Sequence, residues 1–359
     1  MSSHPQAHSS SIASSFARIM YTNAVYFLSS RVYLGDTPGM LNYRCINRVY
    51  YAYAEVALDG GVYLGDEWAD TRAPVDGVRG ALGSLMHLKQ QHPHLQVILS
   101  VGGESASDVF PVVANDALLR DNFAQSAWGL VEASGLDGID IVWDYPCTVE
   151  QGVNFIALLA AVRNYLPQNH HLLTAALPAS TAVLQFIDFA MAANYLNHIN
   201  VMAYDFFGSW SPRSGHHSQL FAMSHEEPSG SSGVMYLISQ GFPAGGILLG
   251  IPTYGRSFLR ASGPGKKFKG AGGNEGTFEY NGLPREGCEE TVDKNRVSAQ
   301  CVGGDGGFVT YDNPDTVKAK AMFARQKMLG GLYYWNAPAD SKEASRSLIS
   351  AGFIALHSS

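Results

Sequence analysis

Two carboxylates lie four residues apart in the stretch 136–146, LDGIDIVWDYP, whose apolar residues indicate a buried strand. Side chains alternate between the two faces of a strand, so Asp140, Val142 and Asp144 share one face. Trp143 falls on the opposite, packing face. A carboxyl group in apolar surroundings is costly unless it has good partners or a chemical task. The pair therefore indicates an acid/base site, the alternative being a satisfied core acid beside a strand-end turn.

Eight apolar, strand-like segments alternate with helical patterns along the chain. This order is typical of a parallel (β/α)₈ TIM barrel in the α/β class. The spacing between the first two strands also suits a βα unit. The expected strands are 23–28, 48–56, 96–102, 136–146, 172–178, 198–205, 246–254 and 330–336, and the expected helices are 78–93, 115–134, 150–165, 180–195, 230–241 and 315–328.

The carboxyl ends of barrel strands meet at one face, where such folds place their chemistry. The sequence predicts an acidic, aromatic-lined pocket there. Rings offer flat apolar faces for stacking, and carboxylates and Tyr hydroxyls supply protons and hydrogen bonds. The candidate catalytic residues are Asp144, Asp140, Tyr204, Asp205 and Glu104, and the candidate substrate-binding residues are Tyr26, Phe27, Tyr53, Val142, Met202, Tyr254, Arg256 and Trp335.

Length and composition exclude several classes of protein. The chain has 359 residues, 46% hydrophobic and 15% charged, which suits one large globular fold. Its net charge of -7 argues against nucleic acid and anionic membranes as partners. No apolar run approaches the ~20 residues of a membrane span. Residues 1–20 are expected to form a disordered tail without a secretory signal, which predicts a cytoplasmic protein.

The sequence shows no metal or cofactor signature. His216-His217 and His170-His171 lack carboxylate or Cys partners at ligand spacing, so we interpret them as surface or loop histidines. No dinucleotide or flavin fingerprint is present, which predicts cofactor-free chemistry. The four cysteines are too scattered for a disulfide framework. Cys288 and Cys301 could pair in an oxidising compartment, although we expect reduced thiols.

Five motifs in order resemble glycoside hydrolase family 18, the chitinases and chitinase-like proteins. Asp137, Gly138, Asp140, Tyr145 and Pro146 match its active-site strand, Asp-Gly-x-Asp-x-Asp-x-Glu-Tyr-Pro. The other four motifs are Ser100-Val-Gly-Gly103, Met202-Ala-Tyr-Asp205, Tyr254-Gly-Arg256-Ser-Phe258 and Gly330-Gly-Leu-Tyr-Tyr-Trp335.

The resemblance implies a small α+β insertion between strand seven and helix seven, which forms one wall of a substrate groove. The segment that breaks the βα rhythm, 257–309, fits this position, and a structureless loop of that length would be unusual. The expected domains are therefore a tail over 1–20, a barrel over 21–256 and 310–359, and the insertion over 257–309. We expect a monomer or weak dimer with a small molecule or oligosaccharide in the barrel mouth.

Family members cleave β-1,4-linked N-acetylglucosamine polymers by using the acetamido oxygen of the substrate as the nucleophile. The resemblance implies that the motif Glu protonates the leaving oxygen and that the central Asp stabilises the cation. Here Asp144 replaces the Glu and Val142 replaces the central Asp. Glu104 stands where family chitinases often have Trp; it is either a site carboxylate or a solvated loop acid.

Three functions remain open from the sequence. We favour a barrel redeployed as a cofactor-free acid/base enzyme on a small molecule other than chitin, for example in a biosynthetic cyclisation, isomerisation or dehydration. Val142 makes the pocket more apolar, which suits a hydrophobic ligand and raises the pKa of a neighbouring acid. The alternatives are a non-catalytic, lectin-like chitooligosaccharide-binding protein and a weak glycosidase with Asp144 as general acid.

Overall fold

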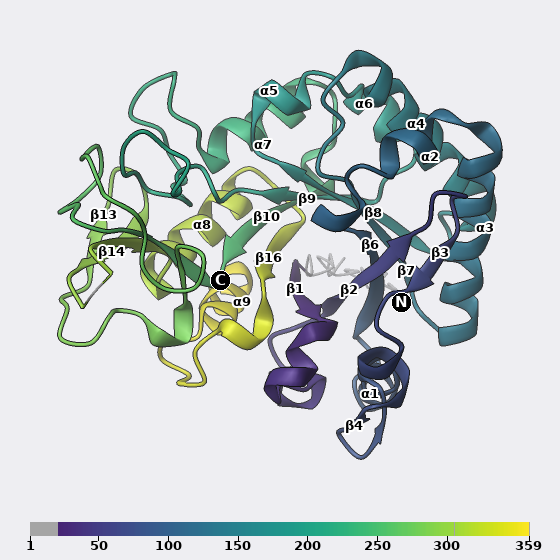
Figure 1. Cartoon of the computed structure of the whole chain (residues 1–359), viewed down its shortest axis with the longest axis horizontal. Coiled ribbons are helices and arrows are strands. Elements are labelled where there is room, and N and C mark those ends of the chain that lie inside the picture. Colours follow the sequence, from purple (N-terminus) through teal and green to yellow (C-terminus); the bar gives the residue numbers. More distant parts are fainter. Residues whose placement is uncertain (1–20, 305, 359) are drawn as a thin grey trace, which may run out of the picture.

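The computed structural model describes residues 21–304 and 306–358, so the predicted tail over 1–20 lies outside the described residues. Eight parallel strands close into a barrel because β1 pairs with both β2 and β16 (Figure 1). The predicted fold class is confirmed. The barrel strands are β1 Thr22–Leu28, β2 Arg48–Val56, β6 Gln96–Gly102, β7 Gly138–Val142, β8 Leu172–Pro178, β9 His198–Met202, β10 Ile247–Pro252 and β16 Gly331–Trp335.

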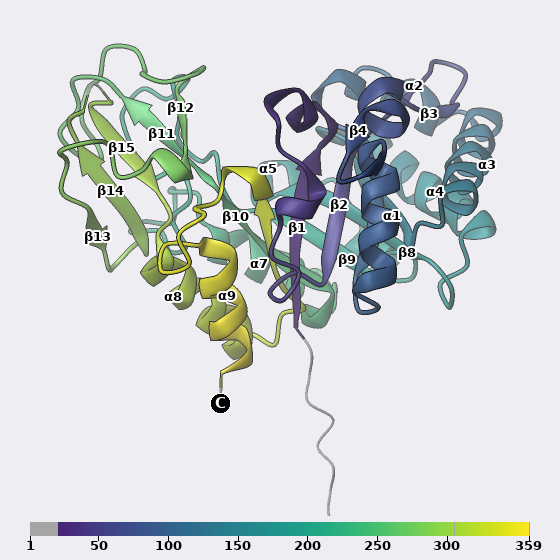
Figure 2. The ribbon, with the colours of Figure 1, turned by 90° about the horizontal axis from the view of Figure 1, so that it is seen from below.

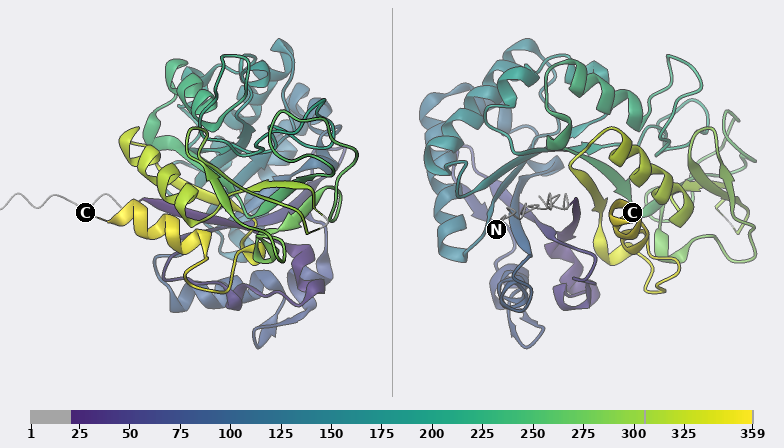
Figure 3. Two further views of the ribbon diagram at one scale, coloured as in Figure 1. Left: turned by 90° about the vertical axis from the view of Figure 1, so that its left-hand side faces the viewer. Right: turned by 180° about the vertical axis from the view of Figure 1, so that it is seen from behind.

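Helices cover the outside of the barrel, and Figure 3 shows the last two, α8 and α9, in yellow-green and yellow. Side-chain caps explain where several of the helices begin, for example α3 and α8. Asp116 accepts hydrogen bonds at the start of α3, and Asn313 forms a capping box with Thr316 at the start of α8. The helices are α1 Ala81–Gln91, α2 Phe110–Asn115, α3 Ala117–Ser134, α4 Val149–Tyr165, α5 Thr181–Leu184, α6 Phe189–Ala192, α7 Gly230–Ser239, α8 Pro314–Gln326 and α9 Leu348–His357.

Two expected elements differ from the sequence prediction. Between β1 and β2, where a βα unit was expected, the chain forms 3₁₀ turns at Ser29–Leu34 and Pro38–Met40. Gly35 ends the first of these turns in a left-handed conformation. The expected helix 180–195 is two single-turn helices, α5 and α6, and the second begins at its own cap, Asp188.

The connection from β2 to α1 carries small additional elements. They are β3 Val62–Leu64, which pairs antiparallel with β2, a π-helical turn Trp68–Arg72, and the hairpin of β4 Pro74–Val75 with β5 Val78–Arg79. Among the described residues, none of the helices has the length and apolar character needed to cross a membrane.

The segment between β10 and α8 forms a five-stranded antiparallel sheet beside the barrel (Figure 1, Figure 2). Its strands, in the order β12-β11-β15-β14-β13, run from Tyr254 to Tyr311, a slightly wider range than the predicted 257–309. The helical content between those described strands is one 3₁₀ turn, Tyr280–Gly282. The strands are β11 Tyr254–Phe258, β12 Thr277–Glu279, β13 Thr291–Asp293, β14 Ser298–Val302 and β15 Phe308–Tyr311. Cys288 and Cys301 are free thiols, as are Cys45 and Cys147.

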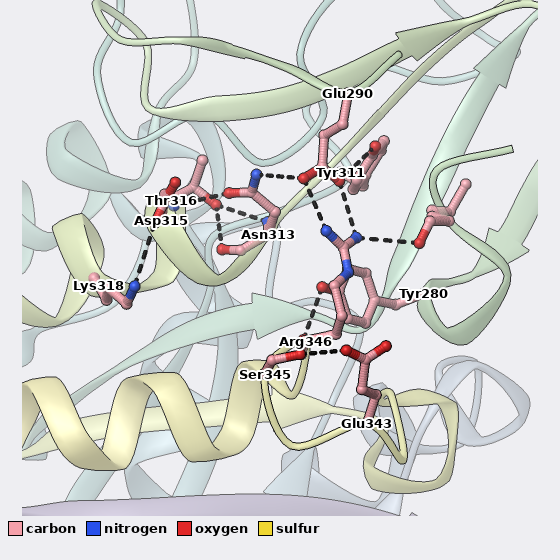
Figure 4. Close-up of polar contacts among 11 residues, drawn as sticks. Tyr280, Glu290, Tyr311, Asn313, Asp315, Thr316, Lys318, Glu343, Ser345 and Arg346 are labelled. Atoms are coloured by element: carbon pink, nitrogen blue, oxygen red, sulfur yellow. Dashed lines mark hydrogen bonds and ion pairs between the residues drawn. The ribbon is translucent and has the colours of Figure 1, made fainter. Parts of the chain in front are cut away.

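A polar joint fixes the insertion to the barrel, and Figure 4 shows its side chains. Arg346, in the loop before α9, donates to both carboxylate oxygens of Glu290 at 2.9 Å each. Tyr311 and Asn313 donate to the same carboxylate, also at 2.9 Å. Tyr280 of the insertion donates to the backbone oxygen of Arg346 at 2.8 Å. Such bidentate, charge-assisted contacts are the strong class of hydrogen bond, so this joint holds the insertion in place.

From this joint we expect Glu290→Gln to lower the free energy of unfolding more than Asp315→Asn does. Glu290→Gln should lower the free energy of unfolding by about 1–3 kcal/mol, because it removes the charge that four donated hydrogen bonds share. Hydrogen bonds and the charge of Arg346 outweigh burial and lower the pKa of Glu290, so its contribution should be present near neutral pH and fade as the pH falls below its ordinary pKa. Urea unfolding at pH 7 and pH 4 measures both effects.

Asp315→Asn is the matched control, since the Lys318–Asp315 pair in the same view is exposed. It should change the free energy of unfolding by less than about 0.5 kcal/mol. Equal effects of the two substitutions would show that the Glu290 joint contributes nothing beyond surface charge.

Candidate active site

Asp140 is fully buried at the centre of the barrel and accepts four hydrogen bonds. Thr174 and Asn200 donate to Oδ1 at 2.6 and 3.2 Å. Tyr26 and Ser100 donate to Oδ2 at 2.7 and 3.0 Å. Burial raises the pKa of Asp140, and these hydrogen bonds oppose the rise. Four donors and no acceptor suit a carboxylate whose task is to fix the side chains around it.

Asp144 lies two residues beyond the end of β7, and the alternation of the strand continues to it. Trp143 packs in the outer layer between Phe110 and Phe155, with ring centroids at 5.5 and 6.3 Å, so its predicted packing role is confirmed. Asp144 faces the barrel mouth. Its Oδ1 is buried and has no hydrogen-bond partner among the described residues. Burial, with the nearby charge of Glu104, raises the pKa of Asp144 to about 6.

Glu104 reaches this position because the end of β6 passes very close to the end of β7. The amide of Gly103 donates to the Val142 oxygen at 2.8 Å. A Cβ at Gly102 would lie 2.3 Å from the same oxygen, and the φ of Gly102 is +113°, so glycine is required there. Glu104 itself is exposed at the rim and is not a wall of the pocket.

A cavity of about 90 Å³ opens above Asp140, and aromatic rings form most of its wall. Trp335, at the end of β16, lies 5.0 Å from the ring of Tyr26 and 6.1 Å from that of Tyr53. Val142, the last residue of β7, and Asp144 complete the cavity wall on the β7 side. The lining residues are Tyr26, Tyr53, Val142, Asp144, Ala176, Met202, Tyr204, Tyr333 and Trp335. Six of the candidate residues, together with Asp144, thus meet in one place.

A second cavity of about 270 Å³ adjoins the first, because Met202 and Tyr204 line both. Asp205 and Tyr145 belong to its wall. The two cavities together form a cleft along the barrel mouth, with Asp144 in one part and Asp205 in the other.

Asp205 is fixed by hydrogen bonds and charged contacts from residues that do not line either of these two cavities. Tyr254 donates to its Oδ1 at 2.7 Å and Arg256 at 2.5 Å. Nδ1 of His217 lies 3.5 Å from the same oxygen. Burial acts to raise the pKa of Asp205, but His217 and Arg256 outweigh it and hold the pKa well below its ordinary range. Tyr254 and Arg256 therefore position Asp205, and their predicted contact with a ligand stays a prediction.

One sequence prediction is wrong, and another is confirmed only in part. Phe27 was predicted to bind substrate, but it is buried in the outer layer against Tyr51, because it falls on the opposite strand face from Tyr26. His216 and His217 were interpreted as surface or loop histidines; they lie in a loop but are buried. Their sequence contains no signal for burial, because the insertion that covers them is distant in the chain: His216 bonds Thr310 at 3.0 Å.

A larger cavity, of about 480 Å³, lies elsewhere, between residues 36–46 and 337–350. Its buried carboxylate, Asp340, already accepts hydrogen bonds from Ser347 and from the amides of Leu348 and Ile349. That acid caps α9 and is not available for chemistry, so we place the candidate site in the barrel mouth. Within the described part of the chain, no group of three His, Cys, Asp or Glu residues could hold a metal ion.

The sequence and structure are similar to those of known chitinases. The profile of glycosyl hydrolases family 18 matches residues 22–340. Chitinase 1 of Aphanocladium album is 35% identical, covering 94% of this chain and 86% of the relative. Endochitinase 1 of Metarhizium robertsii is also 35% identical, covering 92% and 84%.

Among solved structures, the family 18 chitinase of Cycas revoluta in complex with (GlcNAc)3 matches with a TM-score of 0.82 and 26% identity, covering 92% of this chain and 98% of that one. Catalytic domain 2 of the Group II chitinase of Ostrinia furnacalis matches with a TM-score of 0.84 and 22% identity, covering 94% and 96%, which supports the fold alone.

The raised pKa of Asp144 predicts how Asp144→Asn changes stability with pH. The folded protein binds this proton more tightly than the unfolded chain, so the stability from Asp144 is present below its ordinary pKa and is lost as the pH rises towards 6. The difference between about 6 and the ordinary 3.8 corresponds to at most about 3 kcal/mol. Asp144→Asn should therefore be more stable than the wild type at pH 7.5, and this advantage should shrink as the pH falls through 6 and disappear below about 3.8.

Urea unfolding of both proteins across this range measures the effect. Asp188→Asn, a substitution of an exposed helix cap, serves as a control for general pH effects. Parallel profiles for the wild type and Asp144→Asn would contradict the raised pKa.

Proposed function

This chain belongs to glycosyl hydrolase family 18, and on that premise we propose that it binds β-1,4-linked N-acetylglucosamine oligosaccharides in the barrel mouth and hydrolyses them poorly or not at all. The observation that carries the proposal is the aromatic wall around Trp335, where Tyr26 and Tyr53 lie within 5.0 and 6.1 Å. Flat rings of this kind stack on the apolar faces of sugars. The similar chitinase of Cycas revoluta was solved with (GlcNAc)3.

Two residues argue against efficient hydrolysis. Val142 is 3% exposed and lines the cavity between Asp140 and Asp144, so no carboxylate stands at the central position of the motif. Asp140 does not replace it, since both of its oxygens already accept hydrogen bonds in the barrel core. A positive charge developing on a sugar there would meet an isopropyl group in place of an anion.

Asp144 keeps the proton-donor chemistry but not the length of a glutamate. Its pKa of about 6 suits a general acid, because a useful fraction is protonated near neutral pH. Its side chain is one methylene shorter, and a misplacement of about 1 Å can cost about 10²-fold in rate. We therefore infer that a sugar is held in the cleft without efficient protonation of its leaving oxygen.

A second candidate function is the redeployed, cofactor-free acid/base enzyme acting on a small molecule other than chitin. The observation in its favour is the unpartnered Oδ1 of Asp144, which faces a cavity walled by Val142, Ala176 and Met202. A protonated acid in such apolar surroundings suits an apolar substrate. We rank it second because the aromatic wall that suits a sugar is intact.

The binding proposal predicts a specific role for Trp335. Trp335→Ala should weaken the affinity for chitotetraose by about 10- to 100-fold, the loss expected for an aromatic anchor at the centre of a binding site. Calorimetric titration of chitotetraose into the purified protein measures it. Trp128→Ala is the matched control, because Trp128 lies on α3, away from the cleft, and should leave the affinity unchanged.

Wild-type protein that binds no chitotetraose at millimolar concentration would overturn the sugar proposal. The second candidate would then stand, and small molecules that co-purify with the protein would be the first ligands to test.

The explanation for lost hydrolysis predicts a gain from restoring the motif. Val142→Asp together with Asp144→Glu should raise hydrolysis of a fluorogenic chitobioside by at least about 10²-fold, because positioned acid/base groups contribute about 10²–10⁴-fold. Val142→Asn with Asp144→Glu restores polarity and length without the charge and should gain much less. Efficient hydrolysis by the wild type itself would show that Asp144 suffices as the acid.

A further inference from the structure

A guanidinium group is buried in the barrel without a carboxylate beside it. Arg48, on β2, is 3% exposed. Its Nε and Nη2 donate to Gln96 at 3.1 and 2.9 Å, and its Nη1 lies 3.3 Å from Nδ1 of His198. Burial, and then the charge of Arg48, lower the pKa of His198 to about 3, so that ring is a neutral acceptor. None of the ion pairs in the described chain includes Arg48, whereas Lys320, another buried cation, pairs with Asp312.

A chain of hydrogen bonds leads from Arg48 to Asp140. Nη1 of Arg48 donates to the Tyr50 hydroxyl at 3.2 Å, and this hydroxyl donates to Oδ1 of Asn200 at 3.1 Å. Nδ2 of Asn200 donates to Oδ1 of Asp140 at 3.2 Å and to the Tyr26 hydroxyl at 3.0 Å. Tyr26 in turn donates to Oδ2 of Asp140.

Every donor in this chain points away from the cation and towards the anion. Aligned hydrogen bonds polarise one another, so the two charges interact through Tyr50 and Asn200 more strongly than their separation suggests. A single buried charge without compensation would be expensive for the fold, and two opposite charges in one dry interior offset part of that cost.

We propose that Arg48 is the counter-charge of Asp140 and, through it, a positioning residue for the pocket above. Asp140 fixes the Tyr26 hydroxyl, and the Tyr26 ring stacks on Tyr50 at 4.7 Å and forms the pocket wall beside Trp335 at 5.0 Å. The charge at the bottom of the barrel thus sets both the ionisation of Asp140 and the placement of a pocket ring. This inference does not depend on which ligand the pocket takes.

The ionisable groups that face Asp140 come from several strands. Tyr26 is on β1, Arg48, Tyr50 and Tyr53 are on β2, and Tyr333 is on β16. Burial raises the pKa of each of these tyrosines, so none becomes an anion near neutral pH. Arg48 is therefore the one charged group in this set besides Asp140.

A thermal-melting cycle with Arg48→Met, Asp140→Asn and the double variant tests the proposal. Each single variant leaves one buried charge uncompensated and should melt several degrees below the wild type. The double variant has neither charge and should melt above Arg48→Met. Melting temperatures of Arg48→Met should also fall more steeply than those of the wild type from pH 5 to pH 8, since loss of the cation makes the Asp140 anion harder to form. In the double variant, Asp140→Asn removes the carboxyl group that titrates, so this steeper fall of the melting temperature should disappear.

Ser100→Ala combined with Arg48→Met is the matched control, because Ser100 also donates to Asp140 but carries no charge. The loss of Ser100 should lower the melting temperature by an amount that adds to the effect of Arg48→Met, and it should not restore stability. If Arg48→Met is insoluble, the yield of soluble protein in the Asp140→Asn background becomes the readout, and recovery supports the proposal. Additive melting shifts with parallel pH profiles, or equal insolubility of the double variant, would overturn it.

Discussion

The buried carboxylate of Asp140 is the constraint around which this barrel is arranged. It sits at the centre of a closed sheet, where an anion is tolerated only if surrounding groups replace the water it has lost. Donors from four other strands do so, from Tyr26 on β1, Ser100 on β6, Thr174 on β8 and Asn200 on β9. The same contacts fix the interior rings, so the shape of the mouth depends on a polar core that must be satisfied as a unit.

Chemistry at the mouth follows from how the strands end. Alternation along β7 continues past its last residue and brings Asp144 to the cleft above Val142. Beyond β9, Asp205 adopts a φ of +61° and is held by Tyr254 and Arg256 of the inserted sheet. One carboxylate is thus left without a partner and protonates readily, while the other is tightly paired and stays charged. This division suits a site that grips a polar ligand but lacks the central anion for glycosidic cleavage.

Much of this arrangement could be predicted from sequence because it rests on local periodicity. The period of two placed Trp143 and Asp144 on opposite faces, and the order of strand-like and helical segments indicated the barrel. Predictions failed where a distant segment decides the outcome. Phe27 was included with Tyr26 because both lie near a strand end, but the face of the strand excludes it. His217 is buried against Tyr254 of the inserted sheet, 37 residues further along the chain. The role of Arg48 needed coordinates, since four strands contribute to one hydrogen-bonded chain.

The most direct test of the central claim, a sugar held without efficient cleavage, is a crystal structure of the wild-type protein soaked with chitotetraose at neutral pH. The account predicts an intact oligosaccharide along the cleft with one ring stacked on Trp335 and its glycosidic oxygen beyond hydrogen-bond reach of Asp144. Shortened products in the cleft, or an empty cleft at saturating ligand, would contradict it.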